Sequence, residues 1–227
     1  MSEQSAVQNP MIKYAGQIGW EILSRQQATQ MRGGEAGLYL TDTLKKKLQE
    51  LNPFLTPDLV DEVARQLGLL HTTIEGNRDA LEWLRGQKSV FVPAENRERN
   101  VRLIDFEDET ANDFHVTDEW KYKAGLASGN RADVTFLING IPVAICETKG
   151  AGKPDWIAEG VHQLRRYHRE TPELVTSPQV YEVTQLLDLY YGPTWSMSRK
   201  AALNWREEAE DAASYEAKVK SFFDRTR

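Results

Sequence analysis

The chain has 227 residues, of which 40% are hydrophobic and 27% are charged, so it can bury one core and suggests one domain, two at most. No apolar run is long enough to span a membrane, the first residues lack a signal-peptide pattern, and a single cysteine cannot form an internal disulfide, so we expect a globular cytoplasmic protein. The net charge of −6 argues against a dedicated nucleic-acid binder, although a module tolerates it when its basic residues cluster locally.

The first third of the chain is expected to be a helical scaffold. The apolar spacing between Pro10 and about Gln30 predicts a helix, a turn and then a short strand. A further helix is predicted from Thr41 to Leu51, with leucines along one face. Thr56 is expected to cap the next helix and Asn77 another, because such side chains accept hydrogen bonds from free N–H groups at a helix start.

From Ser89 onward the sequence changes to β character. Strands are predicted at 90–92, 99–106 and 114–116, and an acidic turn separates the last two. Asp105 is a candidate site carboxylate, but an Asp that serves a turn is the interpretation we favour.

Residues 131–149 carry the strongest pattern in the chain. Two stretches of alternating apolar residues flank Asn139-Gly140, a typical hairpin turn because both residues tolerate positive φ. Asp133 lies at the start of the first arm, whereas Glu147 and Lys149 end the second. The hairpin therefore brings two carboxylates and an ammonium to one edge of an apolar sheet.

The register of the hairpin decides whether these groups share a face. A plain two-residue loop pairs Asp133 with Cys146, which puts Asp133 on the opposite face from Glu147. A three-residue loop with Gly140 in a G1 bulge restores the shared face, and so does a bulge elsewhere in the arms. If the groups form one site, we expect one of these irregularities. Cys146 itself is expected to be a small core residue, not a nucleophile.

Two carboxylates close together at one edge of a sheet suit a hard divalent cation such as Mg²⁺ or Mn²⁺. The cation would polarise a phosphodiester and activate a water, and Lys149 would orient or deprotonate that water or stabilise charge on the phosphate. A structural salt bridge at the sheet edge is the alternative interpretation, because the Asp…Glu-x-Lys spacing is loose.

A helix is predicted from about Asp155 to Glu170. Its buried stripe is expected to consist of Ile157, Val161, Leu164 and His168. Gln163 and Tyr167 are i,i+4 neighbours on an adjacent stripe. Basic residues nearby are candidates for DNA binding, with a solvated helix face as the alternative: Lys153, Arg165, Arg166 and Arg169.

Taken together, Asp133, Glu147-Thr148-Lys149 and Gln163-x-x-x-Tyr167 resemble the nuclease motifs of the restriction (R) subunit of type I restriction–modification enzymes, members of the PD-(D/E)xK nuclease superfamily. The similarity extends over about residues 3 to 205. Two positions depart from the family pattern. Ala132 replaces the usual proline, and Gln8 stands where the family often has an acidic residue in the first helix; a neutral side chain there could still hold a water at the cation.

The resemblance implies an α/β, restriction-endonuclease-like fold, with a mixed central β-sheet flanked by helices. It also implies Mg²⁺-dependent cleavage of double-stranded DNA that is non-specific at the cut site. The metal ligands would be Asp133, Glu147 and the backbone carbonyl of Thr148, with Mn²⁺ as a substitute for Mg²⁺. Lys149 would serve the attacking water. Positioning of the scissile phosphate or the neighbouring strand would fall to Gln163 and Tyr167.

The resemblance further implies a larger assembly. Residues 1–200 would form the nuclease domain, and residues 201–227 a helical tail that leads into a motor domain absent from this chain. ATP would act only through that motor, and the partners would be double-stranded DNA and the methyltransferase and specificity subunits of a restriction–modification complex. Two alternatives stay open: a non-catalytic module that docks DNA or subunits, and a standalone PD-(D/E)xK repair nuclease.

Overall fold

A mixed sheet forms the centre of the computed structural model, which describes residues 4–125, 129–150, 152, 154–196, 198–206 and 214–226. Within those residues it has seven strands, in the spatial order β1 (Glu21–Leu23), β4 (Phe114–Tyr122), β5 (Asn130–Ile138), β6 (Ile141–Thr148), β7 (Val180–Thr184), β8 (Leu189–Pro193) and β9 (Leu203–Asn204). Parallel pairs join β1 to β4 and β6 to β7, and the other neighbours are antiparallel. The expected α/β fold with a mixed sheet is confirmed.

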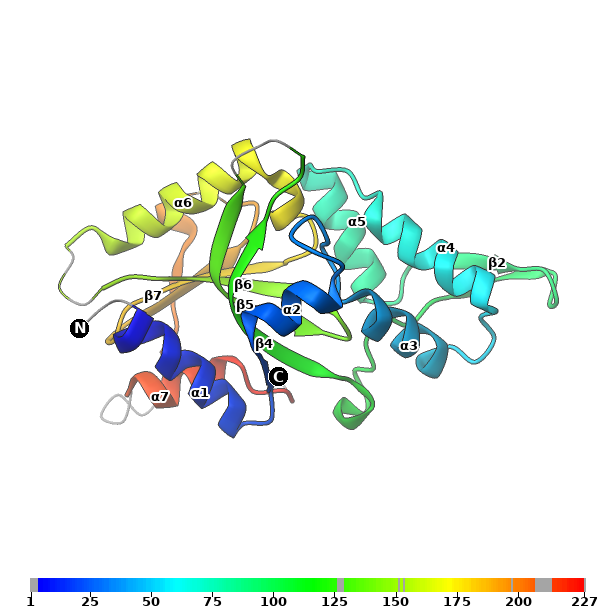
Figure 1. The fold of residues 1–227 in the computed structure, drawn as a ribbon, viewed down its shortest axis with the longest axis horizontal. Coiled ribbons are helices and arrows are strands. Elements are labelled where there is room, and N and C mark those ends of the chain that lie inside the picture. The colour runs from blue at the N-terminus through cyan, green and yellow to red at the C-terminus, as the bar shows by residue number, and fades with distance from the viewer. Residues whose placement is uncertain are drawn as a thin grey trace.

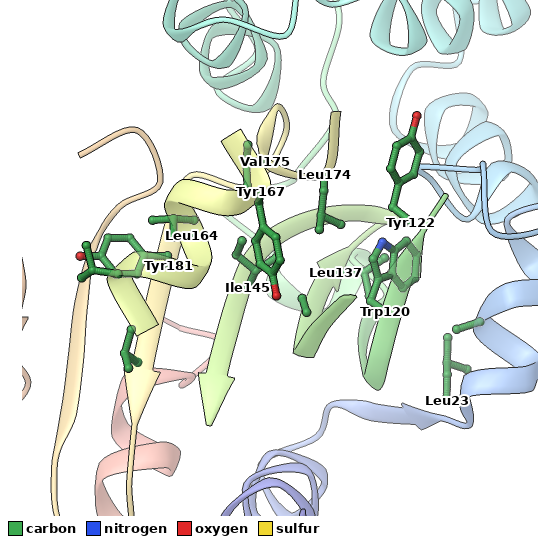
Figure 2. Close-up of a cluster of buried hydrophobic side chains, with 14 of the residues drawn as sticks. Leu23, Trp120, Tyr122, Leu137, Ile145, Leu164, Tyr167, Leu174, Val175 and Tyr181 are labelled. Carbon is green, nitrogen blue, oxygen red and sulfur yellow. The ribbon is translucent and has the colours of Figure 1, made fainter. Parts of the chain in front are cut away.

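Helices cover both faces of this sheet (Figure 1). One face carries α6 (Trp156–Glu170), which connects the parallel strands β6 and β7, as a crossover must. The other face carries α1 (Asn9–Gln17), which follows the π-helix η1 (Gln4–Gln8), and α7 (Tyr215–Phe222). The core under α6 unites aromatic and aliphatic side chains of helix and sheet, including Trp120, Ile145, Leu164, Tyr167 and Tyr181 (Figure 2).

A helical flank extends from one end of the sheet, at the right of Figure 1. It contains α3 (Thr41–Leu51), α4 (Pro57–Gly68), α5 (Ile74–Leu84) and the hairpin of β2 (Ser89–Val92) and β3 (Arg97–Asn100). The flank has its own core, which reaches the central sheet at Ile141. The amide of Leu40 also donates to the carbonyl of Gly140 at 2.9 Å, so the tip of the β5–β6 hairpin is fixed to the flank. Short 3₁₀ helices are η2 (Glu109–Ala111), η3 (Pro172–Val175) and η4 (Arg199–Ala201).

The structure confirms some of the helix predictions for the first third of the chain and corrects others. The helix over residues 41–51 is confirmed, and the Thr56 side chain caps α4. Asn77 is not a cap, because Thr73 caps α5 and the buried amide of Asn77 donates to the carbonyls of Thr176 and Pro178. The prediction also missed α2 (Arg25–Met31), which begins with a capping box between Ser24 and Gln27.

The strand predicted over 99–106 is wrong beyond Asn100. The side chain of Asn52 donates to the carbonyl of Arg102 at 2.8 Å and accepts from its amide at 2.8 Å, so it occupies the backbone groups that a neighbouring strand would use. Asp105 accepts from the amides of Glu107 and Asp108, as expected for a turn residue. The strand predicted at 114–116 is the start of the longer β4.

The C-terminal residues pack back onto the sheet and do not form one continuous helix. Leu203–Asn204 is a strand, and the helix α7 covers only Tyr215–Phe222 among the described residues of the tail. Phe223 stacks on Phe136 with ring centroids 3.6 Å apart, and its carbonyl accepts from the indole of Trp20 at 2.9 Å. In the part of the chain that the structure describes, every helix is too short or too polar to cross a membrane.

Candidate active site

The β5–β6 hairpin sets the register of the candidate site. Ile138 pairs with Ile141, and Asn139 and Gly140 have φ values of 52° and 81°, so the loop has two residues. A bulge between Phe136 and Leu137 then shifts the register, so that Val134 pairs with Cys146. Asp133 therefore lies opposite Glu147. The bulge expected in the arms is confirmed, and the alternative three-residue loop is wrong.

Asp133 is buried, and the end of β6 fixes one of its oxygens. Oδ2 accepts from the backbone amide of Thr148 at 2.9 Å and from its hydroxyl at 3.1 Å. The amide group of Gln8 donates to the carbonyl oxygen of Asp133 at 2.7 Å, so η1 supports the same residue from below the sheet. Oδ1 has a guanidinium nitrogen of Arg131 at 4.0 Å, which is at the outer limit of an ion pair.

The ammonium of Lys149 lies within a group of oxygen atoms. Nζ donates to the carbonyl of Thr148 at 3.0 Å, to Oε1 of Gln163 at 3.2 Å and to Oε2 of Glu147 at 3.4 Å. Lys149 and Glu147 are 6% and 4% exposed, so the ammonium interacts with these oxygen atoms with little screening by water. The carboxylate and carbonyl oxygens thus already surround a cationic group.

Tyr167 approaches this group from α6, where its ring points toward the sheet beside Ile145 (Figure 2). The rotation of α6 about its own axis differs from the prediction, because Ile157 and His168 are only half-buried. The buried face of the helix consists of Trp156, Gly160, Val161, Leu164 and Tyr167. A Cβ atom on Gly160 would lie 2.3 Å from Val183, so the glycine allows this close approach of helix and sheet.

The hydrogen bonds of Tyr167 indicate where a proton lies. Its hydroxyl accepts from Nε2 of Gln163 at 2.9 Å, donates to the carbonyl of Arg131, and lies 2.5 Å from Oε1 of Glu147. A phenol has one proton, so it can satisfy both acceptors only if a protonated Glu147 donates to the phenol oxygen.

Burial favours the same proton position. It raises the pKa of Glu147 to about 8, the nearby charge of Asp133 contributes further, and Lys149 and Tyr167 partly oppose the shift. Burial also raises the pKa of Tyr167, which stays a neutral phenol. At neutral pH the carboxyl of Glu147 is therefore largely protonated when no cation is bound.

The candidate DNA-binding arginines lie elsewhere on α6. Arg165, Arg166 and Arg169 are exposed on the outer side of the helix, and Arg166 pairs with Glu170 at 4.0 Å. Lys153 falls outside the described residues. DNA binding by these residues stays a prediction.

A hard divalent cation fits the donor set of the site. Among the described residues, no group of three or more His, Cys, Asp or Glu side chains could hold a metal ion. Asp133, Glu147 and the carbonyl of Thr148 supply three oxygen donors, a number typical of Mg²⁺ sites that complete their shell with water. Two of these donors, Oε2 of Glu147 and the Thr148 carbonyl, already accept from the Lys149 ammonium.

Glu119 is a residue near the site that the sequence did not reveal. Asp118 pairs with Val134 and Trp120 pairs with Ala132, so Glu119 lies opposite Asp133. Its φ is 48°, and its carboxylate pairs with Arg25 and Arg131. The only signal in the sequence is an acidic pair, Asp118-Glu119, that interrupts the alternation of β4.

Comparison with known proteins gives one consistent family. Residues 1–195 match the family described as type I restriction enzyme R protein N terminus. The chain is 25% identical over 209 residues to the MjaIXP type I restriction enzyme endonuclease subunit of Methanocaldococcus jannaschii, which covers 88% of the chain and 20% of that protein. It is 33% identical over 117 residues to the MjaVIIP endonuclease subunit of the same organism, covering 52% of the chain and 10% of that protein. It is also 22% identical over 184 residues to the HindI endonuclease subunit of Haemophilus influenzae, covering 77% of the chain and 17% of that protein. The chain therefore spans a fifth or less of the length of these relatives.

Proposed function

The chain belongs to the family of type I restriction enzyme R protein N-terminal regions, and from this premise we propose that it is a Mg²⁺-dependent endonuclease domain that hydrolyses phosphodiester bonds of double-stranded DNA. The observation that carries the proposal is the convergence of four elements on one buried polar group. β5 supplies Asp133, β6 supplies Glu147 and Lys149, α6 supplies Gln163 and Tyr167, and η1 holds Asp133 through Gln8.

Asp133, Glu147 and the carbonyl of Thr148 would hold Mg²⁺ or its substitute Mn²⁺. When bound, the cation would polarise the phosphodiester and make a water nucleophilic near neutral pH. Glu147 must lose its proton to serve as a ligand, because only the carboxylate binds a hard cation well. Tyr167 would then donate to the carboxylate, which keeps Glu147 in place without a change of side-chain position.

Lys149 has a role that follows from its position. Nζ of Lys149 contacts Glu147 and the Thr148 carbonyl, so the ammonium lies beside the place that a water or a phosphate at these ligands would take. There it would orient the attacking water or stabilise the charge that develops on the phosphate. Gln163 contacts both Lys149 and Tyr167, so it links the position of the ammonium to that of the helix.

The curated relatives suggest the setting in which such a domain would act. They are named as endonuclease subunits of type I restriction enzymes, and we propose that this chain acts with a methyltransferase and a specificity subunit in the cytoplasm. ATP would act only through a motor domain and not through the residues of this site. The residues of the site would contact the phosphate backbone, so cleavage would not depend on sequence at the cut site.

Calorimetric titration with Mn²⁺, paired with a plasmid-nicking assay, tests the proposal. We expect Asp133→Ala to abolish both Mn²⁺ binding and nicking. We expect Lys149→Ala to retain Mn²⁺ binding but to lose about 10²-fold or more in nicking, because Lys149 serves the reaction and not the cation. Asp61→Ala, an exposed aspartate that pairs with Lys45 on the helical flank, is the matched control and should behave as wild type.

Two results of these titrations would contradict the proposal. Wild-type protein that binds no Mn²⁺, or an Asp133→Ala variant that binds it as well as wild type, would refute the metal site. The remaining interpretation would then be a non-catalytic module that docks DNA or subunits.

A further inference from the structure

Glu119 adopts a backbone conformation that is unusual for its residue type. Its φ of 48° lies in the left-handed region, in the middle of a nine-residue strand, where residues other than glycine, asparagine and aspartate are rarely found. Such a conformation costs on the order of 1–3 kcal/mol and persists only where the surrounding structure enforces it. The residues on both sides of Glu119 pair regularly with β5, so the strained conformation is confined to the position opposite Asp133.

At the row of Glu119 and Asp133, the side chains of β4 and β5 that pack in one core give way to side chains that pack in the core on the other face of the sheet. Before this row, Val116 and Val134 belong to the core beneath α1 and α7. After it, Trp120 and Ala132 belong to the core beneath α6. Because side chains alternate strictly in a regular strand, this exchange requires a local departure in both strands. Glu119 and Asp133 are the two residues at the exchange.

The carboxylate of Glu119 holds two arginines. Oε1 pairs with Nη1 of Arg131 at 2.9 Å, and Oε2 pairs with Nη1 of Arg25 at 2.5 Å. The side chain of Glu119 is 12% exposed, whereas those of Arg131 and Arg25 are 48% and 51% exposed. A carboxylate with so little exposure fixes the arginine better than a fully solvated ion pair would.

Arg131 is the arginine that matters for the site. It precedes Asp133 by two residues, and its Nη2 lies 4.0 Å from Asp133 Oδ1. Oδ2 of the same aspartate is already engaged by Thr148, so Oδ1 is the oxygen left for a cation. A guanidinium that moved about one ångström closer would form a full ion pair with Oδ1 and compete with that cation.

We propose that Glu119 is a positioning residue that holds the guanidinium of Arg131 away from Asp133 Oδ1 and so keeps this oxygen available to the divalent cation; the inference rests on the proposed function of the site. From its position opposite Asp133, where φ is 48°, the Glu119 carboxylate pairs with the guanidinium of Arg131. Arg25 fixes the other carboxylate oxygen and so orients Glu119.

Mn²⁺ titration of four proteins tests this inference: wild type, Glu119→Gln, Arg131→Gln and the double variant. Glu119→Gln releases Arg131 onto Asp133, and we expect the Kd for Mn²⁺ to rise about fivefold, the change that one partly exposed ion pair produces. Arg131→Gln removes the competitor, so the double variant should bind Mn²⁺ at least as tightly as wild type. Glu35→Gln, which removes an ion-paired carboxylate from Lys121 near the same strand, is the control and should leave the Kd unchanged.

Rescue by the second substitution separates this role from a purely structural one. A Glu119 that only stabilised the fold would lower the thermal midpoint, and loss of Arg131 would not restore binding. The inference would be overturned if Glu119→Gln had the Kd for Mn²⁺ of the wild type, or if the double variant bound Mn²⁺ as weakly as Glu119→Gln. Either result would leave the Asp133-dependent site in place. Absence of Asp133-dependent binding in the wild type would overturn the proposed function and the inference together.

Discussion

Lowering the pH should weaken cation binding far more than an ordinary carboxylate site allows. The pKa of Glu147 is raised to about 8, chiefly by burial and then by the charge of Asp133. Below that pKa the cation must displace a proton, so the apparent affinity falls with the ionised fraction of Glu147. Between about pH 7 and about pH 6 this fraction falls about ninefold, whereas an unperturbed Glu would stay almost fully ionised over the same range.

Calorimetry in two buffers that differ in ionisation enthalpy measures this effect directly. We expect the Kd for Mn²⁺ to rise about ninefold from about pH 7 to about pH 6, with close to one proton released for each ion bound near pH 6. The position of the proton follows from the structure, because Tyr167 can satisfy both Glu147 and the carbonyl of Arg131 only when Glu147 is protonated. A Kd that changes less than twofold with no proton release would refute this reasoning.

Two further predictions concern stability. In Gly140→Ala a Cβ would lie 2.7 Å from the carbonyl oxygen of Leu40, so chemical denaturation should show that the free energy of unfolding falls by about 3 kcal/mol. In the control Gly33→Ala, where φ is also positive but no atom lies within 4 Å, it should fall by only about 1 kcal/mol. Equal losses in the two variants would contradict the clash. Glu182 is fully buried, and burial raises its pKa to about 8. Its contribution to the free energy of unfolding is therefore fully present below the unfolded pKa of about 4.5 and is lost as pH rises through about 8. Without metal, the wild-type free energy of unfolding should therefore fall faster with pH than that of Glu182→Gln, by about 1.4 kcal/mol per pH unit between about pH 5 and about pH 7.5; parallel curves would show that Glu182 does not titrate in this way.

The sequence by itself determined the local features that the site depends on. Asn139-Gly140 predicts the turn because few other pairs adopt two positive φ values, and Glu147-x-Lys149 must share a face because strand side chains alternate. Gln163 and Tyr167 must be neighbours because they are four residues apart on a helix. These relations depend only on backbone geometry within one element, so they can be inferred before the fold is known.

Only the tertiary structure decided how these local features meet. The bulge at Phe136 and Leu137 turns Asp133 to the face of Glu147, and Gly160 lets α6 bring Tyr167 against the sheet. Asn77 was wrongly predicted as a cap because its partner Thr176 lies 99 residues away along the chain. The contact of Asn52 with Arg102, 50 residues away, was not predicted for the same reason. The strain at Glu119 arises where two strands pair, and the proton on Glu147 is a consequence of burial. Strand register, helix rotation and loss of solvent are properties of the packed molecule, and no single segment carries them.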